Sequence, residues 1–181
     1  MKKIVLLGGS ENHLRNLFMA QLTEQYLVTE VSLDGIRSSG QGEECLLISF
    51  NEVRRVLSSD TIVVLQNHAR ISKDWRIAND GLVIVNAVNQ KQLERLAEAG
   101  IPAVTCGMSG KDTFTFSSKS EGRYAVSLQR SILLPGGRSI EPQEILLTLP
   151  PNHDDYSILA MGAVFILLKS VSESISTDED D

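Results

Sequence analysis

Residues 1–18 read MKKIVLLGGSENHLRNLF, and this stretch decides the expected fold. The apolar run Ile4–Leu7 predicts a short buried strand, which Gly8 and Gly9 bring to an end. Apolar residues then recur at helical spacing, which predicts an amphipathic helix. They are Leu14, Leu17, Phe18 and Leu22. Many nucleotide-binding domains begin with a strand, a glycine turn and a helix, so the turn raises the question of phosphate binding.

The alternation of strands and helices continues to about residue 110. Apolar runs predict strands at residues 28–33, 45–50, 61–66, 81–87 and 101–106. Helices are expected over residues 50–58 and 89–100, and a turn rich in Gly and Ser over residues 35–42. Strands that are apolar on both faces are typical of a parallel sheet covered by helices. We therefore expect an α/β fold, a three-layer αβα sandwich with a mostly parallel sheet.

The pattern changes at Lys111. Segments that alternate at period two, with turn signals such as Pro135-Gly136-Gly137, predict a small antiparallel β meander. One face of its core is expected to hold Phe114, Phe116, Tyr124, Val126 and Leu128. The apolar run Ile158–Leu168 predicts a buried helix, and it is too short to cross a bilayer.

A single unit over residues 1–181 is expected from this order. It would contain a parallel α/β core at 1–110, an antiparallel extension at 111–150, a closing helix at 151–172 and an acidic tail at 173–181.

Composition limits the classes of function. The chain has 181 residues, 42% hydrophobic and 22% charged, as in ordinary globular proteins. A net charge of −6 argues against nucleic acid as a partner, and no membrane association is expected. Cys45 and Cys106 are expected to be buried thiols without a disulfide or a metal. Because the first residues lack a long apolar signal region, we expect a cytoplasmic protein.

Three motifs occur in a distinctive order. GLVIVNAVN at 81–89 is followed by IPAVTCGMSGKD at 101–112, the meander, and PNHDDYSILAMGAV at 151–164. In this order the chain resembles the central, ATP-binding domain of the Mur ligases, a family that includes folylpolyglutamate synthetase and forms amide bonds through an acyl phosphate. The resemblance covers nearly the whole chain and implies ATP and magnesium as cofactors.

The opening turn departs from the family's phosphate loop, which runs Gly-Thr-x-Gly-Lys-Thr/Ser. Aligned on Gly8, the chain has Glu11 at the second glycine, Asn12 at the lysine and His13 at the hydroxyl position. A carboxylate repels phosphate, and no cation replaces the lysine. Arg15 lies one helical turn further on and is expected to point to solvent.

The closing motif is only partly retained. His153 matches the family's histidine, whereas Asp154 and Ser157 stand where asparagines are usual. The resemblance also implies a carbamylated lysine and magnesium ligands before residue 81. By residue type, the candidates there are Glu52, His68 and Lys73.

The resemblance implies a candidate remnant of a nucleotide site, formed by Gly8, Gly9, Ser10, Asn12, His13, Asn86, His153 and Asp154. Simpler interpretations stay open for each of them. The glycines suit any tight strand-to-helix turn, Ser10 or Asn12 suits a helix cap, and Asp154 or Asp155 suits a cap of the last helix. Asn67, His68 and Asn89 follow strands at the edge where α/β proteins bind ligands. Trp75 is expected to pack in the interior.

The leading prediction is a degenerate, stand-alone Mur-ligase-like domain, a pseudoenzyme that acts as a binding or regulatory module. It assigns no catalytic residue and no metal ligand. The alternative is an ATP-dependent amide ligase that uses a non-standard phosphate loop and a partner subunit. A third reading, a nicotinamide-dependent oxidoreductase, is disfavoured because the third glycine of its fingerprint is missing. The edge of the meander favours a homodimer or a protein partner.

Overall fold

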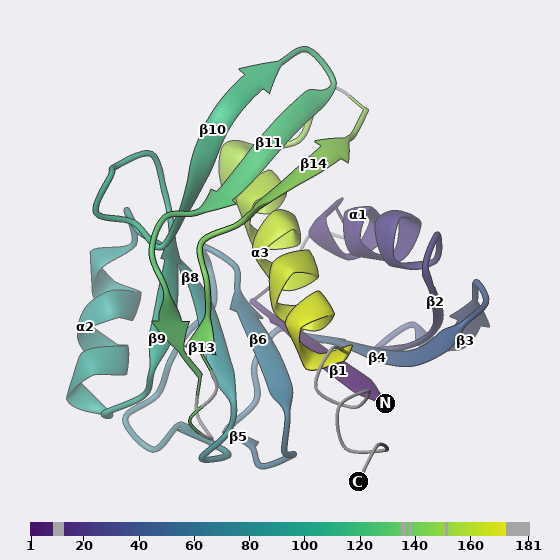
Figure 1. Ribbon diagram of the computed structural model, residues 1–181. Coiled ribbons are helices and arrows are strands. Elements are labelled where there is room, and N and C mark those ends of the chain that lie inside the picture. The colour runs from purple at the N-terminus through teal and green to yellow at the C-terminus, as the bar shows by residue number, and fades with distance from the viewer. Residues whose placement is uncertain (9–12, 135–136, 138, 151, 173–181) are drawn as a thin grey trace, which may run out of the picture. The chain divides into compact units, whose positions relative to one another are not determined.

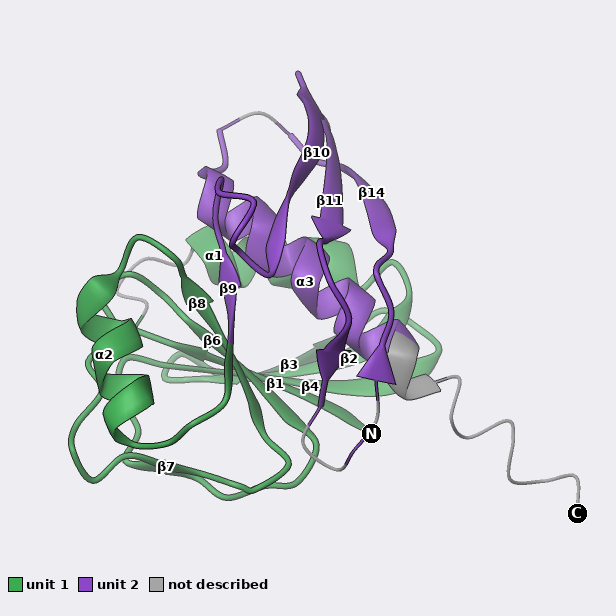
Figure 2. Cartoon of the chain, turned by 60° about the vertical axis from the view of Figure 1, so that its left-hand side comes forward, with its two compact units in different colours: residues 1–103 green, residues 104–181 purple. Residues whose placement is uncertain are grey.

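A computed structural model describes residues 1–8, 13–134, 137, 139–150 and 152–172, with side chains as far as residue 169. The described helices and strands are labelled in Figure 1. The chain divides into two compact units, Met1–Ala103 and Val104–Asp181, which Figure 2 colours separately. Its architecture is α/β, with mostly parallel strand pairing in unit 1 and three helices among the described residues. The expected α/β class and the mostly parallel sheet are therefore confirmed.

Unit 1 is built on a sheet with strand order β8-β6-β1-β4-β2-β3. Every described pairing in it is parallel except β2 with β3. The elements of unit 1 are β1 (Lys2–Leu7), α1 (His13–Leu22), β2 (Tyr26–Ser32), β3 (Gly35–Ser39), β4 (Glu43–Phe50), β5 (Arg55–Val56), β6 (Thr61–Leu65), β7 (Arg76–Ile77), β8 (Leu82–Asn86) and α2 (Gln90–Glu98). The central strands β6 and β8 are buried along their whole length, as expected for strands covered on both faces.

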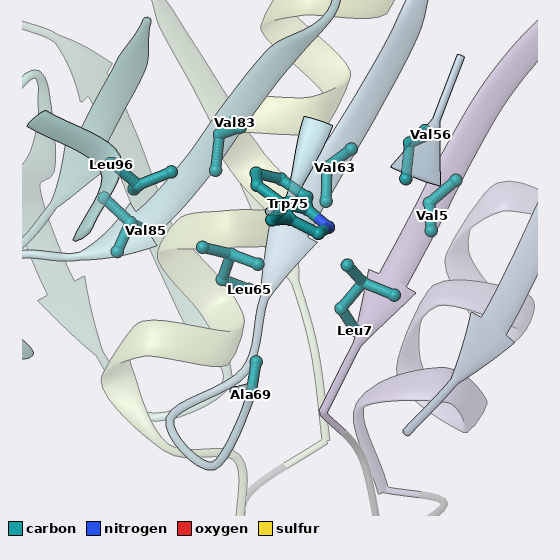
Figure 3. Packing of buried hydrophobic residues seen from close by; sticks show 10 residues of the cluster. All are labelled: Val5, Leu7, Val56, Val63, Leu65, Ala69, Trp75, Val83, Val85 and Leu96. Atoms are coloured by element: carbon teal, nitrogen blue, oxygen red, sulfur yellow. The ribbon is translucent and has the colours of Figure 1, made fainter. Parts of the chain in front are cut away.

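The two helices of unit 1 lie against opposite faces of this sheet. On one face, alternate residues of β1, β6 and β8 pack with Leu96 of α2 around Trp75 (Figure 3). On the other face, Glu30 of β2 forms an ion pair with Arg15 of α1. Trp75 is 1% exposed, so the prediction that it packs in the interior is confirmed.

Two local predictions in unit 1 are wrong. Residues 50–58 form no helix, because Arg55 and Val56 pair as the short strand β5 with β7. Most of the expected turn at 35–42 is strand β3, which pairs with β2. In both cases the hydrogen bonds go to a partner strand that a local pattern does not show.

Unit 2 contains an antiparallel meander and one helix. Its elements are β9 (Ala103–Cys106), which starts at the unit boundary, β10 (Phe114–Ser120), β11 (Arg123–Leu128), β12 (Ile132–Leu133), β13 (Ser139–Ile140), β14 (Glu144–Thr148) and α3 (Asp155–Ser172). Strand β11 pairs antiparallel with β10 and β14, and β12 pairs with β13. The predicted antiparallel strands and the final helix are confirmed.

Helix α3 packs on the meander of unit 2. It contacts β10, β11 and β14, and a Cβ built on Gly162 would lie 2.6 Å from Cβ of Val126. The glycine therefore allows helix and sheet to approach closely. The run Ile158–Leu168 is buried along its whole length, as expected. Among the described residues, none of the helices combines the length and the apolar composition that a membrane span needs.

Candidate functional site

The carboxyl ends of the parallel strands of unit 1 form the expected ligand-binding edge. Within the sheet, β4 and then β2 lie on one side of β1, and β6 and then β8 lie on the other. The chain that leaves the carboxyl end of β1 therefore runs towards β2 on one side, and the chain that leaves the neighbouring end of β6 runs towards β8 on the other. In open α/β sheets this point of divergence is where ligands bind.

Gly8 ends β1 in a conformation that its packing requires. Its φ is +92°, and its N–H donates to the carbonyl oxygen of Phe50 at 3.0 Å. A Cβ at this position would lie 2.3 Å from Cα of Ala69, in the segment after β6. The close approach of the Ala69 backbone is therefore enough to explain why residue 8 is a glycine, and no bound phosphate is needed to explain it. The other turn residues in the candidate remnant, Gly9, Ser10 and Asn12, lie outside the described residues.

Three asparagines join the ends of β6 and β8. Asn86 Nδ2 donates to Asn67 Oδ1 at 2.8 Å, and Asn86 Oδ1 accepts from the N–H of Val88 at 3.2 Å. Asn89 Nδ2 donates to the carbonyl oxygen of Asn67 at 3.0 Å. Asn89 also caps α2, because its Oδ1 accepts from the N–H of Gln92 at 3.3 Å. The polar strand ends noted in the sequence are thus brought together.

Gln92 completes this group, although the sequence pattern did not single it out. Its Nε2 donates to the carbonyl oxygens of Gln66 at 2.8 Å and Ala69 at 3.0 Å. The side chain is buried, and its Oε1 has no hydrogen-bond partner in the described structure. We call Asn67, Asn86, Asn89 and Gln92 the amide cluster. The sequence could have indicated a role for Gln92, since a Gln three residues after a capping residue such as Asn89 is a known pattern at the start of a helix.

The remaining candidate residues are divided between the two units. Gly8, His13 and Asn86 belong to unit 1, whereas His153 and Asp154 belong to unit 2. His13 is the first residue of α1, and its side chain is exposed. Asp154 caps α3, because its Oδ1 accepts from the N–H of Ser157 at 3.0 Å. The capping interpretation of Asp154 is therefore confirmed.

No protein-family model matches the chain, and no curated protein matches it. The resemblance to the Mur ligases therefore stays a prediction that rests on the order of motifs and elements.

Arg15 differs from its prediction. Its side chain is only 13% exposed, with Nε 3.2 Å from Glu30 Oε1 and Nη1 2.8 Å from Asp34 Oδ2. Arg37 of β3 forms a further ion pair with Glu30. Arg15 Nε is close enough to Glu30 for an ion pair, but its N–H is not aligned for a hydrogen bond. Arg15 therefore holds α1 against β2 rather than pointing to solvent, because the fold places the buried carboxylate of Glu30 beside it.

The arrangement at the carboxyl edge suits binding rather than proton transfer. Side-chain amides donate and accept hydrogen bonds but do not titrate near neutral pH. His68 directly follows Asn67, and its side chain is exposed. Among the described residues, no group of three or more His, Cys, Asp or Glu side chains is arranged to hold a metal ion.

Both cysteines are buried free thiols, as expected. Burial raises the pKa of Cys45 from 9.0 to about 11, with a smaller opposing effect from Lys2. Burial also raises the pKa of Cys106, and the nearby carboxylate of Asp112 adds to this rise. Neither thiol forms the thiolate that a nucleophile needs at neutral pH.

We expect the free energy of unfolding to fall as the pH rises above 9. The unfolded chain releases the Cys45 proton near pH 9.0, whereas the folded protein retains it up to about pH 11. Stability that depends on this proton is complete below pH 9.0 and is lost progressively towards pH 11. Cys45 alone should account for about 2–3 kcal/mol, since one pKa unit corresponds to about 1.4 kcal/mol. Urea titrations between pH 8 and 11 measure the decline, and Cys45→Ala should make it shallower. An unchanged slope in that variant would contradict the assignment.

Proposed function

We propose that the chain is a Mur-ligase-like central domain that acts as a non-catalytic binding or regulatory module. The order of its elements supports this proposal. Strand β1, which Gly8 follows, precedes α1, strand β8 ends at Asn86, and helix α2 leads to β9. An antiparallel meander and the final helix α3 follow, as in the resemblance drawn from the sequence.

The proposal that the module is non-catalytic rests on the chemistry of the groups at the carboxyl edge of the sheet. The groups that are hydrogen-bonded to one another there are the neutral amides of the amide cluster, beside a glycine packed against Ala69. Phosphoryl transfer depends on positive charge positioned around the phosphates. The sequence places Glu11 and Asn12 where the family's loop has glycine and lysine. These features favour binding without turnover.

The alternative is an ATP-dependent amide ligase that borrows catalytic groups from a partner subunit. It is favoured by the location of the amide cluster, which lies at the edge where α/β proteins hold nucleotides. The two functions differ in one measurable property, the formation of ADP and phosphate from ATP.

The first test is thermal unfolding of the full chain with millimolar ATP and magnesium, against ADP, UDP-sugars and buffer. A ligand that binds only the folded state raises the midpoint by mass action. The same samples are assayed for release of ADP. The non-catalytic proposal expects no ADP above the level of the Asn12→Ala variant, whether or not the midpoint shifts.

A matched control comes from the same region. Asn16→Ala removes the same side chain from an exposed position one turn into α1. ADP formation that Asn12→Ala abolishes and Asn16→Ala leaves intact would contradict the proposal and favour the ligase. A shift in midpoint that only Asn12→Ala removes would assign nucleotide binding to the opening turn.

A protein partner or a second copy of the chain is proposed at the outer strand of the meander. Strand β14 is the last strand in its sheet, and Leu146 on it is 77% exposed. An unpaired strand edge is a template for pairing with another strand. Sedimentation velocity of the protein and of a Leu146→Lys variant would show whether this edge supports self-association.

A further inference from the structure

The outer strand of the meander, β14, has an open edge with a definite pattern of hydrogen-bonding groups (Figure 1). Within the described part of the chain, β14 pairs with β11 alone. The N–H of Leu128 donates to the carbonyl oxygen of Gln143 at 2.9 Å, and the N–H of Leu149 donates to that of Gly122 at 3.0 Å. Both pairs continue the register of the β11–β14 ladder. They show at which positions β14 turns its backbone groups towards β11.

Hydrogen-bonded and non-hydrogen-bonded positions alternate along an antiparallel ladder. Gln143 and Leu149 are hydrogen-bonded to β11, so the odd-numbered residues between them are as well. The even-numbered residues of the strand therefore direct their N–H and C=O groups towards the open edge. These outward residues are Glu144, Leu146 and Thr148, and their side chains are exposed. The exposed fraction of Leu146 reaches 77%.

Two prolines limit the outward segment. Pro142 and Pro150 occupy the next even-numbered positions on either side of it. A proline has no N–H, so neither residue can donate a hydrogen bond to a further strand. A strand that pairs fully with this edge is therefore confined to residues 144–148.

The outward segment is complementary to a second copy of itself. In an antiparallel pair centred on Leu146, this residue lies opposite Leu146 of the partner subunit, and Glu144 lies opposite Thr148 of the partner subunit. Every outward residue then exchanges hydrogen bonds with another outward residue. Sliding the pair by one residue would put outward groups opposite inward ones. Sliding it by two would put an outward residue opposite a proline, which lacks the donor.

The charges agree with the same register. It keeps Glu144 away from Glu144 of the partner subunit, whereas a parallel pair in register would set these like charges side by side. Arg123 of β11 lies opposite Thr148, on the same face of the sheet. Glu144 and Arg123 of the partner subunit therefore stand about 10 Å apart, two strand spacings, with opposite charges on one face. The apolar contact at the centre is made by the two exposed leucines.

From these observations we propose that the chain forms a symmetric dimer through antiparallel pairing of β14 with β14 of a second copy, with Leu146 at the two-fold axis. The proposal rests on the interaction role proposed above and makes it specific, because it names the partner and the register. The two leucines cover each other, and the meander continues across the axis as one sheet. A strand of 5 residues makes a small interface, so the dimer exchanges with the monomer.

Charge exchange at residue 146 tests the register on the full chain. Sedimentation velocity from micromolar to millimolar protein should show a concentration-dependent dimer. Leu146→Lys and Leu146→Glu should each lower the association constant about tenfold, since each removes the apolar contact and sets like charges opposite each other. In an equimolar mixture of the two variants the constant should recover by about threefold or more, because opposite charges then meet at the axis.

Leu133→Lys is the matched control. It introduces the same charge at a leucine of unit 2 that is 73% exposed and lies on β12, outside the paired edge. It should change the association constant by less than about twofold, since salt screens a charge that lies outside the interface. A thermal midpoint close to that of the unaltered chain shows that each variant is folded.

The outcomes separate the register from the edge. Dimerisation that both Leu146 variants weaken, that their mixture restores and that Leu133→Lys leaves unchanged supports the proposal. Loss without recovery in the mixture, or stronger association of Leu146→Lys, would overturn the register while leaving the edge in use, since residue 146 would then lie opposite another residue, such as Glu144. A protein that stays monomeric, or a dimer that neither Leu146 variant weakens, would overturn the dimer at β14. None of these results depends on the release of ADP, so the dimer and the non-catalytic module can fail separately.

Discussion

Trp75→Ala is expected to lower the free energy of unfolding by about 3–5 kcal/mol, the usual range for large aromatic residues removed from a core. Trp75 is 1% exposed and lies among Val5, Val63, Val83 and Leu96, which come from three strands and a helix (Figure 3). Few neighbours can collapse into the space that the indole leaves, because most of them are held in the sheet. A loss of this size is a large part of the stability of a domain, which is typically about 5–15 kcal/mol.

Urea unfolding followed by far-ultraviolet circular dichroism measures this effect, since the variant lacks the only tryptophan. Trp75→Phe retains most of the apolar volume and should cost clearly less. Leu57→Ala removes a side chain that is 63% exposed, and it should change stability by no more than about 0.5 kcal/mol. A loss from Trp75→Ala as small as that from Leu57→Ala would show that the indole does not lie in the core.

The second large effect is expected from Gly8→Ala. The new Cβ would lie 2.3 Å from Cα and 2.4 Å from N of Ala69, and the φ of +92° is unfavourable for alanine. Conformational strain contributes about 1–3 kcal/mol. Backbone atoms cannot rotate out of the way as a flexible side chain can, so we expect the total loss to exceed about 3 kcal/mol when the clash is added to that strain.

Gly100→Ala separates the two causes. Gly100 also has a positive φ, +65°, but a Cβ there would have no atom within 4 Å. Its loss should therefore reflect backbone strain alone, about 1–2 kcal/mol. The difference between the variants, measured by urea unfolding, reports the contact between Gly8 and Ala69. Equal losses in the two variants would mean that this close approach does not exist.

The strands and helices that were predicted correctly are those with strong local patterns. Residues 62–65 and 82–85 are apolar throughout, and apolar residues recur at helical spacing in residues 90–98 after the cap Asn89. The errors occur where pairing over a distance decides the structure. Val53 and Val56 have helical spacing, yet Val56 pairs with Ile77 in a neighbouring short strand.

The candidate site could likewise be predicted only in part from local sequence. The sequence places Asn67, Asn86 and Asn89 at strand ends, and a parallel sheet brings such ends to one edge. The hydrogen bonds among them, and those that Gln92 donates to the segment after β6, depend on how this segment folds back against α2. Arg15 could not be placed from its own helix, since Glu30 and Asp34 reach it from a later strand and turn.

The position of α3 in the chain has a consequence during synthesis. Strands β10, β11 and β14 all precede the helix that packs on them, so they leave the ribosome first. At about 5–20 residues per second, the 18 residues of α3 take about 1–4 s to make. During these seconds the nascent chain presents Val126 and its apolar neighbours without their cover. Chaperones that bind exposed apolar segments therefore have a defined interval in which to act, and it closes when the last helix emerges.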